Sequence, residues 1–372
     1  MKVKTFGAVD EHSLRQLETC MQAGDAELGV LCADHHPGYS QPIGGGVAYE
    51  GYISPSGVGY DIGCGNKAVL TNLTHDDVRD SVPALMDRIA KRISFGVGVP
   101  AQERADHSVL DEIRDSPLAF QREMLDLAAE QLGTVGGGNH YVDLFRDQDG
   151  RVWVGVHFGS RGFGHRTASR YFGGGGMDAP PELLAADSDR GQEYVEAMTL
   201  AGMYAYAGRD VVVDKVLDIL GARSLYEVHN HHNFAWLEEH FGRRVWVIRK
   251  GCTPARPGQE GFVGGSMGED SVILEGVDGD DARDSLYSTV HGAGRVMSRR
   301  QAKRTVQWDA VRARLREEEI VLRGGGADEA PGAYKRLPEV LAAHAGSIRV
   351  KHTLRPLGVA MAGPHIKDPY KD

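Results

Sequence analysis

VWVGVHF, at residues 152–158, predicts a buried β-strand that ends at a histidine. Its side chains are almost all apolar, which is typical of a strand covered on both faces. The glycine-containing turn GSRG follows directly at 159–162. Because glycine lets the backbone approach a ligand or an ion closely, His157 is a candidate site residue.

The same setting, a metal-binding side chain among glycine residues, recurs along the chain. It is found in DIGCG (61–65), GGGNH (136–140) and HGAGR (291–295), and HNHHNFA (229–235) adds a cluster of histidines. Thiolate and imidazole are ligands that transition metals prefer, and glycine-rich turns also accommodate phosphates. The pattern predicts a metalloenzyme that acts on phosphates.

The segments between these motifs predict strands and helices mixed without a regular βαβ alternation. Helices are expected over residues 11–23, 76–93, 110–132, 190–220 and 297–319, and further strands over 243–251, 271–276 and 347–363. Candidate ligands are spread from residue 34 to residue 291. A site collected from so much of the chain predicts one integrated domain over residues 1–372, with a polar tail in its last few residues.

Composition narrows the class of protein. The chain has 372 residues, 41% hydrophobic and 25% charged, as in an ordinary globular protein. A net charge of −10 argues against a general nucleic-acid coat, although it permits an enzyme with a local arginine patch. The four cysteines form no C-x-x-C pair, and neither a signal peptide nor a membrane span is evident. We therefore expect a cytoplasmic protein without a membrane partner.

Each motif also has a plainer interpretation. Cys64 alone could be an inert buried cysteine, but Asp61 beside it and the glycine-framed histidines favour a metal-binding thiolate, and a thiolate can bridge two metal ions. His140 and His157 could each be hydrogen-bonded core histidines. In HNHHNFA three histidines compete for one role, and His232 is favoured because its asparagine neighbour mirrors that of His140.

His291 has three possible roles. It begins a glycine turn for which we expect a following helix with Arg295, Arg299 and Arg300, so it could be a third ligand, a nucleophile for a phosphoryl or nucleotidyl group, or a helix cap. GGSMG (264–268) fits the serine-hydrolase pattern G-x-S-x-G, but a strand rather than a helix is expected after it. Ser266 and Ser271 are better candidates for phosphate or nucleotide donors.

At this level of detail the chain resembles the RtcB-type RNA ligases over nearly its whole length. The landmarks that carry the resemblance are DHHPGYSQPIGGG (34–46), GVGYDIGCG (57–65), GTVGGGNHYVD (133–143), VHFGSRGFGH (156–165), HHNFAW (231–236), RKGCTPARPGQEG (249–261), GGSMGEDS (264–271), HGAGRVMSR (291–299) and GAYK (332–335). They occur in the order of the family, and together they are very specific.

The resemblance implies an α+β fold of packed sheets flanked by helices, and a ligase that depends on GTP and two Mn²⁺ ions. Such a ligase joins RNA ends bearing a 2′,3′-cyclic phosphate or 3′-phosphate to 5′-hydroxyl ends. Residue by residue it implies that the metal ligands are Asp61, Cys64, His140, His157 and His232. His291 would be the nucleophile that carries GMP.

The resemblance also implies contacts to the nucleotide and to RNA. The residues implied for the nucleotide are Asn139, Asp143, Asn233, Gly264, Gly265, Ser266, Met267, Ser271, Gly292, Ala293, Gly294 and Tyr334. Four arginines, Arg161, Arg249, Arg256 and Arg295, are candidates for RNA or triphosphate oxygens because a guanidinium binds phosphate in a bidentate manner. The partners implied are RNA with broken ends, from tRNA or another RNA, and GTP, and the sequence identifies no activating protein.

The chain departs from the family pattern at three positions. Ala362 stands where the family has a lysine, Gly264 where proline is common, and Asp143 where glutamate is usual. We therefore expect a divergent paralogue with altered nucleotide use, acting in RNA repair rather than housekeeping tRNA splicing. The alternatives are a metal-dependent phosphoesterase that opens cyclic phosphates, and a non-catalytic binder of RNA ends.

Overall fold

The largest sheet brings together strands from both halves of the chain. The structure is a computed structural model and describes residues 1–172, 176–364 and 366. The strand order is β13, β14, β17, β6, β7, β5, β9, and β16 pairs with β17. The strands are β5 (Gly65–Thr74), β6 (Tyr141–Arg146), β7 (Arg151–Phe158), β9 (Ser224–His231), β13 (Glu260–Val263), β14 (Ser271–Gly276), β16 (Val321–Arg323) and β17 (Ile348–Met361).

A second sheet has the order β1, β2, β3, β11, β10. Its strands are β1 (Lys2–Thr5), β2 (Leu28–His36), β3 (Ile43–Tyr49), β10 (Asn233–His240) and β11 (Arg243–Lys250). Two short pairs complete the strands of the described residues: β12 (Cys252–Pro254) with β15 (Ser288–Val290), and β4 (Tyr52–Ile53) with β8 (Leu184–Ala185).

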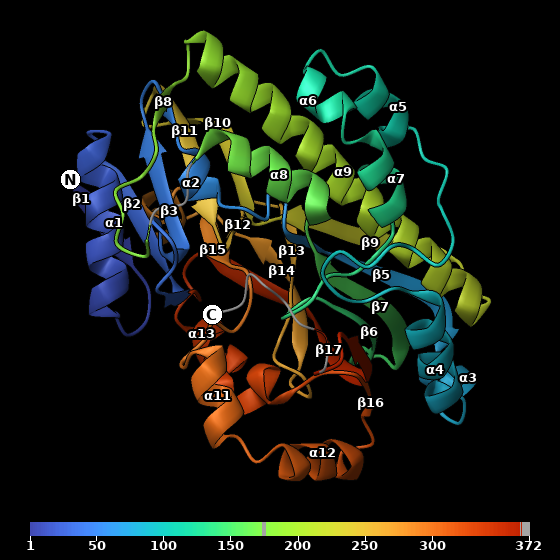
Figure 1. The fold of residues 1–372 in the computed structure, drawn as a ribbon. Coiled ribbons are helices and arrows are strands. Elements are labelled where there is room, and N and C mark those ends of the chain that lie inside the picture. The colour runs from blue at the N-terminus through green and yellow to red at the C-terminus, as the bar shows by residue number, and fades with distance from the viewer. Residues whose placement is uncertain (173–175, 365, 367–372) are drawn as a thin grey trace.

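Helices flank the sheets (Figure 1). They are α1 (Glu11–Ala23), α2 (Pro55–Val58), α3 (His75–Val78), α4 (Val82–Arg92), α5 (Val109–Arg114), α6 (Ala119–Arg122), α7 (Leu125–Gln131), α8 (Arg161–Tyr171), α9 (Asp189–Leu220), α10 (Asp280–Asp284), α11 (Arg299–Thr305), α12 (Trp308–Glu317) and α13 (Leu337–Ala342), with 3₁₀ turns η1 (Ala327–Glu329) and η2 (Pro331–Ala333). This arrangement confirms the predicted α+β class.

Helix α9 is the element that joins the two main parts of the hydrophobic core. Its first half packs against α8 and belongs to the core cluster that also includes residues of α1 and β3, and its second half packs with α4 against β5 and β7. The Ser188 hydroxyl caps its first turn by accepting a hydrogen bond from the Gly191 amide, and Gly221 ends it at φ 64°. The helix was predicted over 190–220, and the prediction is confirmed.

The strands predicted at 152–158, 243–251, 271–276 and 347–363 are confirmed by β7, β11, β14 and β17. The single helix predicted at 76–93 is wrong, because the structure has two helices there, α3 and α4. Pro83 lies in the first turn of α4, where its missing N–H costs nothing, but its ring would clash with a helix running through from α3.

The helix expected at 110–132 is likewise broken into α5, α6 and α7. Pro117 disfavours helical backbone at Ser116, so α5 ends before it. The predicted polar tail lies, apart from Ile366, outside the described residues. Over the part of the chain that is described, no helix is long and apolar enough to cross a bilayer.

Candidate active site

The ends of four neighbouring strands meet at one edge of the large sheet. Strand β7 pairs with β5 through Asn66 and His157, and with β6 through Tyr141 and His157. Strand β5 also pairs with β9 through Gly65 and His231. The residues just beyond these pairs, Cys64 and His232 among them, therefore lie beside His157.

Glycine residues let the side chains come together at this edge. Gly63 has φ 69°, a conformation that other residues rarely adopt, and it forms part of the turn in which the Cys64 amide donates to the Asp61 carbonyl at 3.1 Å. A Cβ at Gly159 would lie 2.1 Å from the Asp61 carboxylate, and one at Gly136 would lie 2.3 Å from His140 Nδ1. The glycine framing seen in the sequence is thus a requirement of close packing.

The five predicted ligands form one cluster with Cys64 at its centre. One group consists of Cys64, His157 and His232, and the other of Asp61, Cys64 and His140, with the donor atoms of each group within 4.8 Å of one another. Cys64 Sγ lies 3.5 Å from His157 Nε2 and 3.7 Å from His140 Nε2, and His140 Nε2 lies 3.2 Å from Asp61 Oδ2. The thiol is the atom common to both groups.

Burial sets the protonation states in the cluster. It lowers the pKa of His157 and His232 well below the usual value, and the neighbouring histidines add to this, so both imidazoles are neutral. Burial and the Asp61 carboxylate raise the pKa of the Cys64 thiol. Burial alone would raise the pKa of Asp61 as well, but the contact with His140 lowers it to about 2.

The donor set fits a metal centre, and the sulfur is common to both groups of ligand atoms. Ligands at about 2.0–2.3 Å from a common ion lie roughly 3–4.5 Å apart. The separations of 3.2, 3.5 and 3.7 Å between donor atoms of the cluster fall in this range. His140 Nδ1 and His232 Nδ1 are buried without a hydrogen-bond partner. Neutral imidazoles, a carboxylate and a thiol that releases its proton to solvent when it binds a cation are suitable ligands for Mn²⁺ or Zn²⁺.

The structure distinguishes the three histidines of HNHHNFA. His232 lies in the cluster, whereas His229 Nε2 accepts from Arg209 Nε at 2.8 Å and His231 Nδ1 lies 3.0 Å from the Gly63 carbonyl oxygen. Arg209, from α9, is fully buried and donates through Nη1 to the carbonyls of Gly63 and Phe158. It braces the backbone beside Cys64 and His157, a role that the sequence did not suggest.

His291 follows β15 and lies beside the cluster, with its ring 4.9 Å from that of His232. Its Nδ1 is 2.6 Å from Oδ2 of Asp34, which also accepts the backbone amides of His291 and Gly292 at 3.0 and 3.3 Å. Burial would raise the pKa of Asp34, but the contacts with His291 lower it, so the carboxylate stays charged. Asp34 begins the motif DHHPG and opens the range of candidate ligands, but the sequence did not suggest its role beside His291.

The helix predicted at 297–319 is confirmed in part, since it is broken into α11 and α12 at Val306 and Gln307 and does not include Arg295. Helix α11 begins only at Arg299, and Arg295 lies before it, paired with Tyr334 in an isolated bridge. His291 is therefore neither a helix cap nor at a helix N-terminus.

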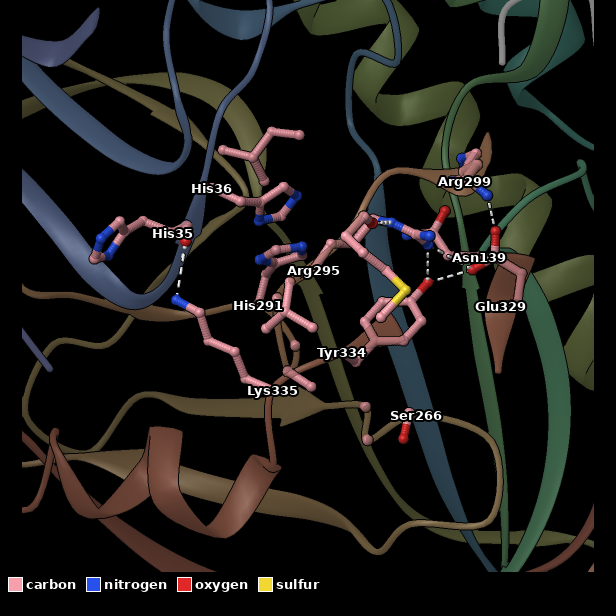
Figure 2. A pocket seen from close by; sticks show the side chains of 18 of the residues that line it. His35, His36, Asn139, Ser266, His291, Arg295, Arg299, Glu329, Tyr334 and Lys335 are labelled. Atoms are coloured by element: carbon pink, nitrogen blue, oxygen red, sulfur yellow. Dashed lines mark hydrogen bonds and ion pairs between the residues drawn. The ribbon is translucent and has the colours of Figure 1, made fainter. Parts of the chain in front are cut away.

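A cavity of about 1100 Å³ opens beside His291 and reaches His157. Figure 2 shows His36, His291 and Lys335 on one side of it and Arg295, Tyr334 and Glu329 on the other. Ten residues predicted for the nucleotide line it: Asn139, Asp143, Gly264, Gly265, Ser266, Met267, Gly292, Ala293, Gly294 and Tyr334.

Two residues predicted for the nucleotide do not line the cavity. The Asn233 amide donates to the Asp61 carbonyl at 3.3 Å and accepts from the Gly251 amide at 2.7 Å, so it ties the metal-binding turn to the segment entering β12. The Ser271 hydroxyl accepts from the Gly265 amide at 3.0 Å and so supports the glycine loop from behind.

Three of the four arginines predicted for phosphates are held elsewhere. Arg249 is fully buried and donates to Glu238, to the Ser288 hydroxyl and to the Leu286 carbonyl, so its geometry is that of a structural arginine. Arg256 donates to the same Glu238. Arg161 donates to the Gly96 carbonyl at 3.0 Å. None of the three lines the cavity.

Arg295 does line the cavity and belongs to a polar network in its wall. It donates to the Tyr334 hydroxyl at 2.9 Å, and Glu329 contacts Tyr334, Arg295 and Arg299. Lys335 donates to the carbonyls of Ala33 and His35 at 2.8 and 2.9 Å, which fixes the strand that carries Asp34. Lys335 was missed, although it ends the motif GAYK.

The departures from the family pattern lie around the same cavity. A Cβ at Gly264 would lie 2.2 Å from the Tyr141 hydroxyl, so Tyr141 and Gly264 fit each other and leave no space for proline. Burial raises the pKa of Asp143 well above its usual value, and its Oδ1 has no partner. Ala362 lies next to the cavity-lining Met361.

Comparison with known proteins gives a consistent result. The family described as "tRNA-splicing ligase RtcB" matches residues 18–362. Among the similar proteins are the tRNA-splicing ligase RtcB of Thermococcus kodakarensis, 33% identical over 91% of this chain and 89% of the relative, and the RNA-splicing ligase RtcB of Escherichia coli K12, 30% identical over 88% of each. The RNA-splicing ligase RtcB of Mycobacterium tuberculosis is 33% identical over 90% of this chain and 97% of the relative.

Proposed function

Because this chain belongs to the tRNA-splicing ligase RtcB family, we propose that it is an RNA ligase that uses GTP and acts in RNA repair in the cytoplasm. It joins RNA ends bearing a 3′-phosphate or a 2′,3′-cyclic phosphate to 5′-hydroxyl ends. The observation that carries the proposal is His291, held by a buried carboxylate 2.6 Å from its Nδ1, at the wall of a large cavity beside a metal-binding cluster.

His291 acts as the nucleophile through Nε2. The Asp34 carboxylate, 2.6 Å from Nδ1, favours the tautomer that carries its proton on Nδ1, so the lone pair of Nε2 is free, and its charge stabilises the positive charge that develops on the ring. Nε2 forms a bond with the α-phosphorus of GTP while the bond from that phosphorus to the β-phosphate oxygen breaks. Pyrophosphate leaves, and GMP remains on His291.

The remaining steps transfer the activated phosphate. An oxygen of the RNA 3′-phosphate attacks the phosphorus of GMP, the P–N bond breaks, and the RNA carries a diphosphate linkage to guanosine. The 5′-hydroxyl then attacks the RNA phosphate, loses its proton and releases GMP. A cyclic phosphate is first opened by water to the 3′-phosphate.

The cluster of Asp61, Cys64, His140, His157 and His232 would hold two Mn²⁺ ions. When bound, they would neutralise phosphate charge next to His291 and lower the pKa of a water molecule. Gly264, Gly265, Gly292 and Gly294 line the cavity without side chains, which gives phosphate or guanosine room to approach the backbone.

The proposal is tested by incubating the protein with Mn²⁺ and α-labelled GTP and looking for label on the denatured chain. We expect label on the parent and none on His291→Ala. The matched control is His36→Ala, which removes another histidine of the same cavity and is expected to retain the label.

A parent protein that stays unlabelled with every nucleoside triphosphate would contradict the nucleotidyl-transfer step. Opening of a 2′,3′-cyclic phosphate by that unlabelled protein would then identify a metal-dependent phosphoesterase, and binding of RNA ends without any reaction would identify a binder.

A further inference from the structure

The outer face of α11 is basic, and the function proposed above makes no use of it. The helix sequence RRQAKRT holds four cations and no acidic residue, in a chain whose net charge is −10. Arg300, Lys303 and Arg304 are exposed, and Ala302 is buried. Since residues three and four apart share a helix face, these three cations form one surface, which we call the α11 basic face.

The charge of this face is only partly balanced. Lys303 lies 3.6 Å from Asp328, but no described carboxylate is within ion-pair distance of Arg300 or Arg304. On the neighbouring helix α12, two of the three arginines are paired, since Arg312 pairs with Asp309 and Arg314 lies 2.7 Å from Glu318. Unbalanced positive charge on an acidic protein indicates a surface for a polyanion.

The α11 basic face continues directly from the cavity of His291. Ser298, Arg299 and Gln301 line that cavity, so the first turn of α11 forms part of its rim. Arg300 is the next residue along the chain. In Figure 1, α11 and α12 lie at the lower edge of the molecule, outside the large sheet. Seven helical residues span about 10 Å, room for about three nucleotides of a stacked strand at roughly 3.4 Å each.

We propose that the α11 basic face binds backbone phosphates of single-stranded RNA close to the end that enters the cavity. This inference rests on the proposed function, which makes RNA the polyanion. The α11 basic face also supplies cations for RNA binding. Such cations are needed because the three arginines first predicted for this role, Arg161, Arg249 and Arg256, are held by internal partners and do not line the cavity. Exposed arginines on a short helix read no sequence, so the contact is independent of base identity.

The test measures binding of a short single-stranded RNA with a 3′-phosphate across a range of salt concentrations. Each phosphate contact on a single strand adds about 0.7 to the slope of log affinity against log salt. For Arg300→Gln/Arg304→Gln the slope is expected to be smaller than that of the parent by about 1.4. The matched control, Arg312→Gln/Arg314→Gln, removes two paired arginines from α12 and is expected to keep the slope of the parent.

An unchanged slope in the α11 variant, or an equal loss in the α12 variant, would overturn the inference. Labelling of the parent with GTP is measured on the same preparation. Loss of slope together with an unlabelled parent refutes the proposed nucleotidyl transfer but supports the RNA surface. A labelled parent with an unchanged slope refutes the surface alone.

Discussion

Asp34 has the contacts of a residue that positions a nucleophile. It is fully buried, it accepts two backbone amides at the turn of His291, and its Oδ2 lies 2.6 Å from the ring nitrogen. A carboxylate in this place fixes the tautomer of the imidazole and its orientation. Its effect on the reaction is therefore exerted through His291.

Replacing Asp34 by asparagine keeps the size of the side chain and removes its charge. An amide can still accept or donate one hydrogen bond, but it no longer stabilises a positive ring, and it permits the wrong tautomer. We expect the rate of GMP transfer to the protein to fall about 10²–10⁴-fold. Single-turnover labelling measures the rate, and an unchanged rate would contradict the positioning role. Metal content, measured in parallel, is expected to match the parent.

The sequence was most informative about which individual residues form the site. Asp61, Cys64, His140, His157 and His232 were all named, and the structure brings all five together. The complete set came from the family resemblance, because each of these side chains taken alone could also have been a buried structural residue. Arg249 shows the limit of such reasoning. Whether an arginine meets phosphate or a buried carboxylate depends on Glu238, which lies on the neighbouring strand.

At the scale of the elements, Glu238 ties β10 to the segments around it. Its carboxylate contacts Arg249 on β11 at 2.6 Å, Arg256 beyond β12 at 3.1 Å and His240 on its own strand at 2.6 Å. Burial would raise the pKa of Glu238, but Arg249 and His240 lower it below its usual value. The carboxylate therefore stays charged while the protein is folded.

Glu238→Gln would leave the fully buried Arg249 without a counter-charge. We expect the free energy of unfolding in urea to fall by about 3–5 kcal/mol. Glu239→Gln, at the exposed neighbouring position, is the control and is expected to change it by less than about 0.5 kcal/mol. Equal effects of the two variants would contradict the structural role of Glu238.

The same carboxylate gives a pH dependence of stability. Because its pKa is lower in the folded protein, its contribution is complete above the unfolded value of about 4.3 and is lost as the pH falls below it. Between about pH 4.5 and 3 the parent should therefore lose more stability than Glu238→Gln. Urea unfolding at each pH measures the difference between the two proteins.

Predictions at the scale of elements succeeded where the local pattern was strong. The long helix α9 and the strands β7, β11 and β14 were placed within one or two residues. Predictions failed where a single residue interrupts a continuous helical pattern, as at Pro83 and Pro117. The helix after His291 was predicted only in part, since Arg295 pairs with Tyr334 instead of entering α11. Such a tertiary contact has no signature in the local sequence.

At the scale of the whole molecule, local sequence patterns do not predict the order of the strands in the sheets. Strand β17, from the C-terminal part, lies between β14 and β6, and β5 lies between β7 and β9. These neighbours are far apart in sequence, and only the packing of both sheet faces selects them. The predicted site nevertheless required such an order, since its ligands come from segments that only this pairing brings to one edge.

This long-range assembly predicts that metal binding stabilises the entire fold. The ligands occupy the ends of β5, β7 and β9 and the entrance to β6, so an ion that binds them favours the folded chain over the unfolded one. At a concentration one hundred times the dissociation constant, one site contributes about 2.7 kcal/mol. For a chain of 372 residues this corresponds to an increase in the melting temperature of about 3 °C.

Scanning calorimetry with Mn²⁺ and then with excess chelator should show the increase and its reversal in the parent. Cys64→Ser, which alters the ligand common to both groups, should show little of either, whereas Cys20→Ser, at a buried cysteine outside the cluster, should respond as the parent does. An equal response of all three proteins would mean that Mn²⁺ binds elsewhere, and the two-ion cluster around Cys64 would be refuted.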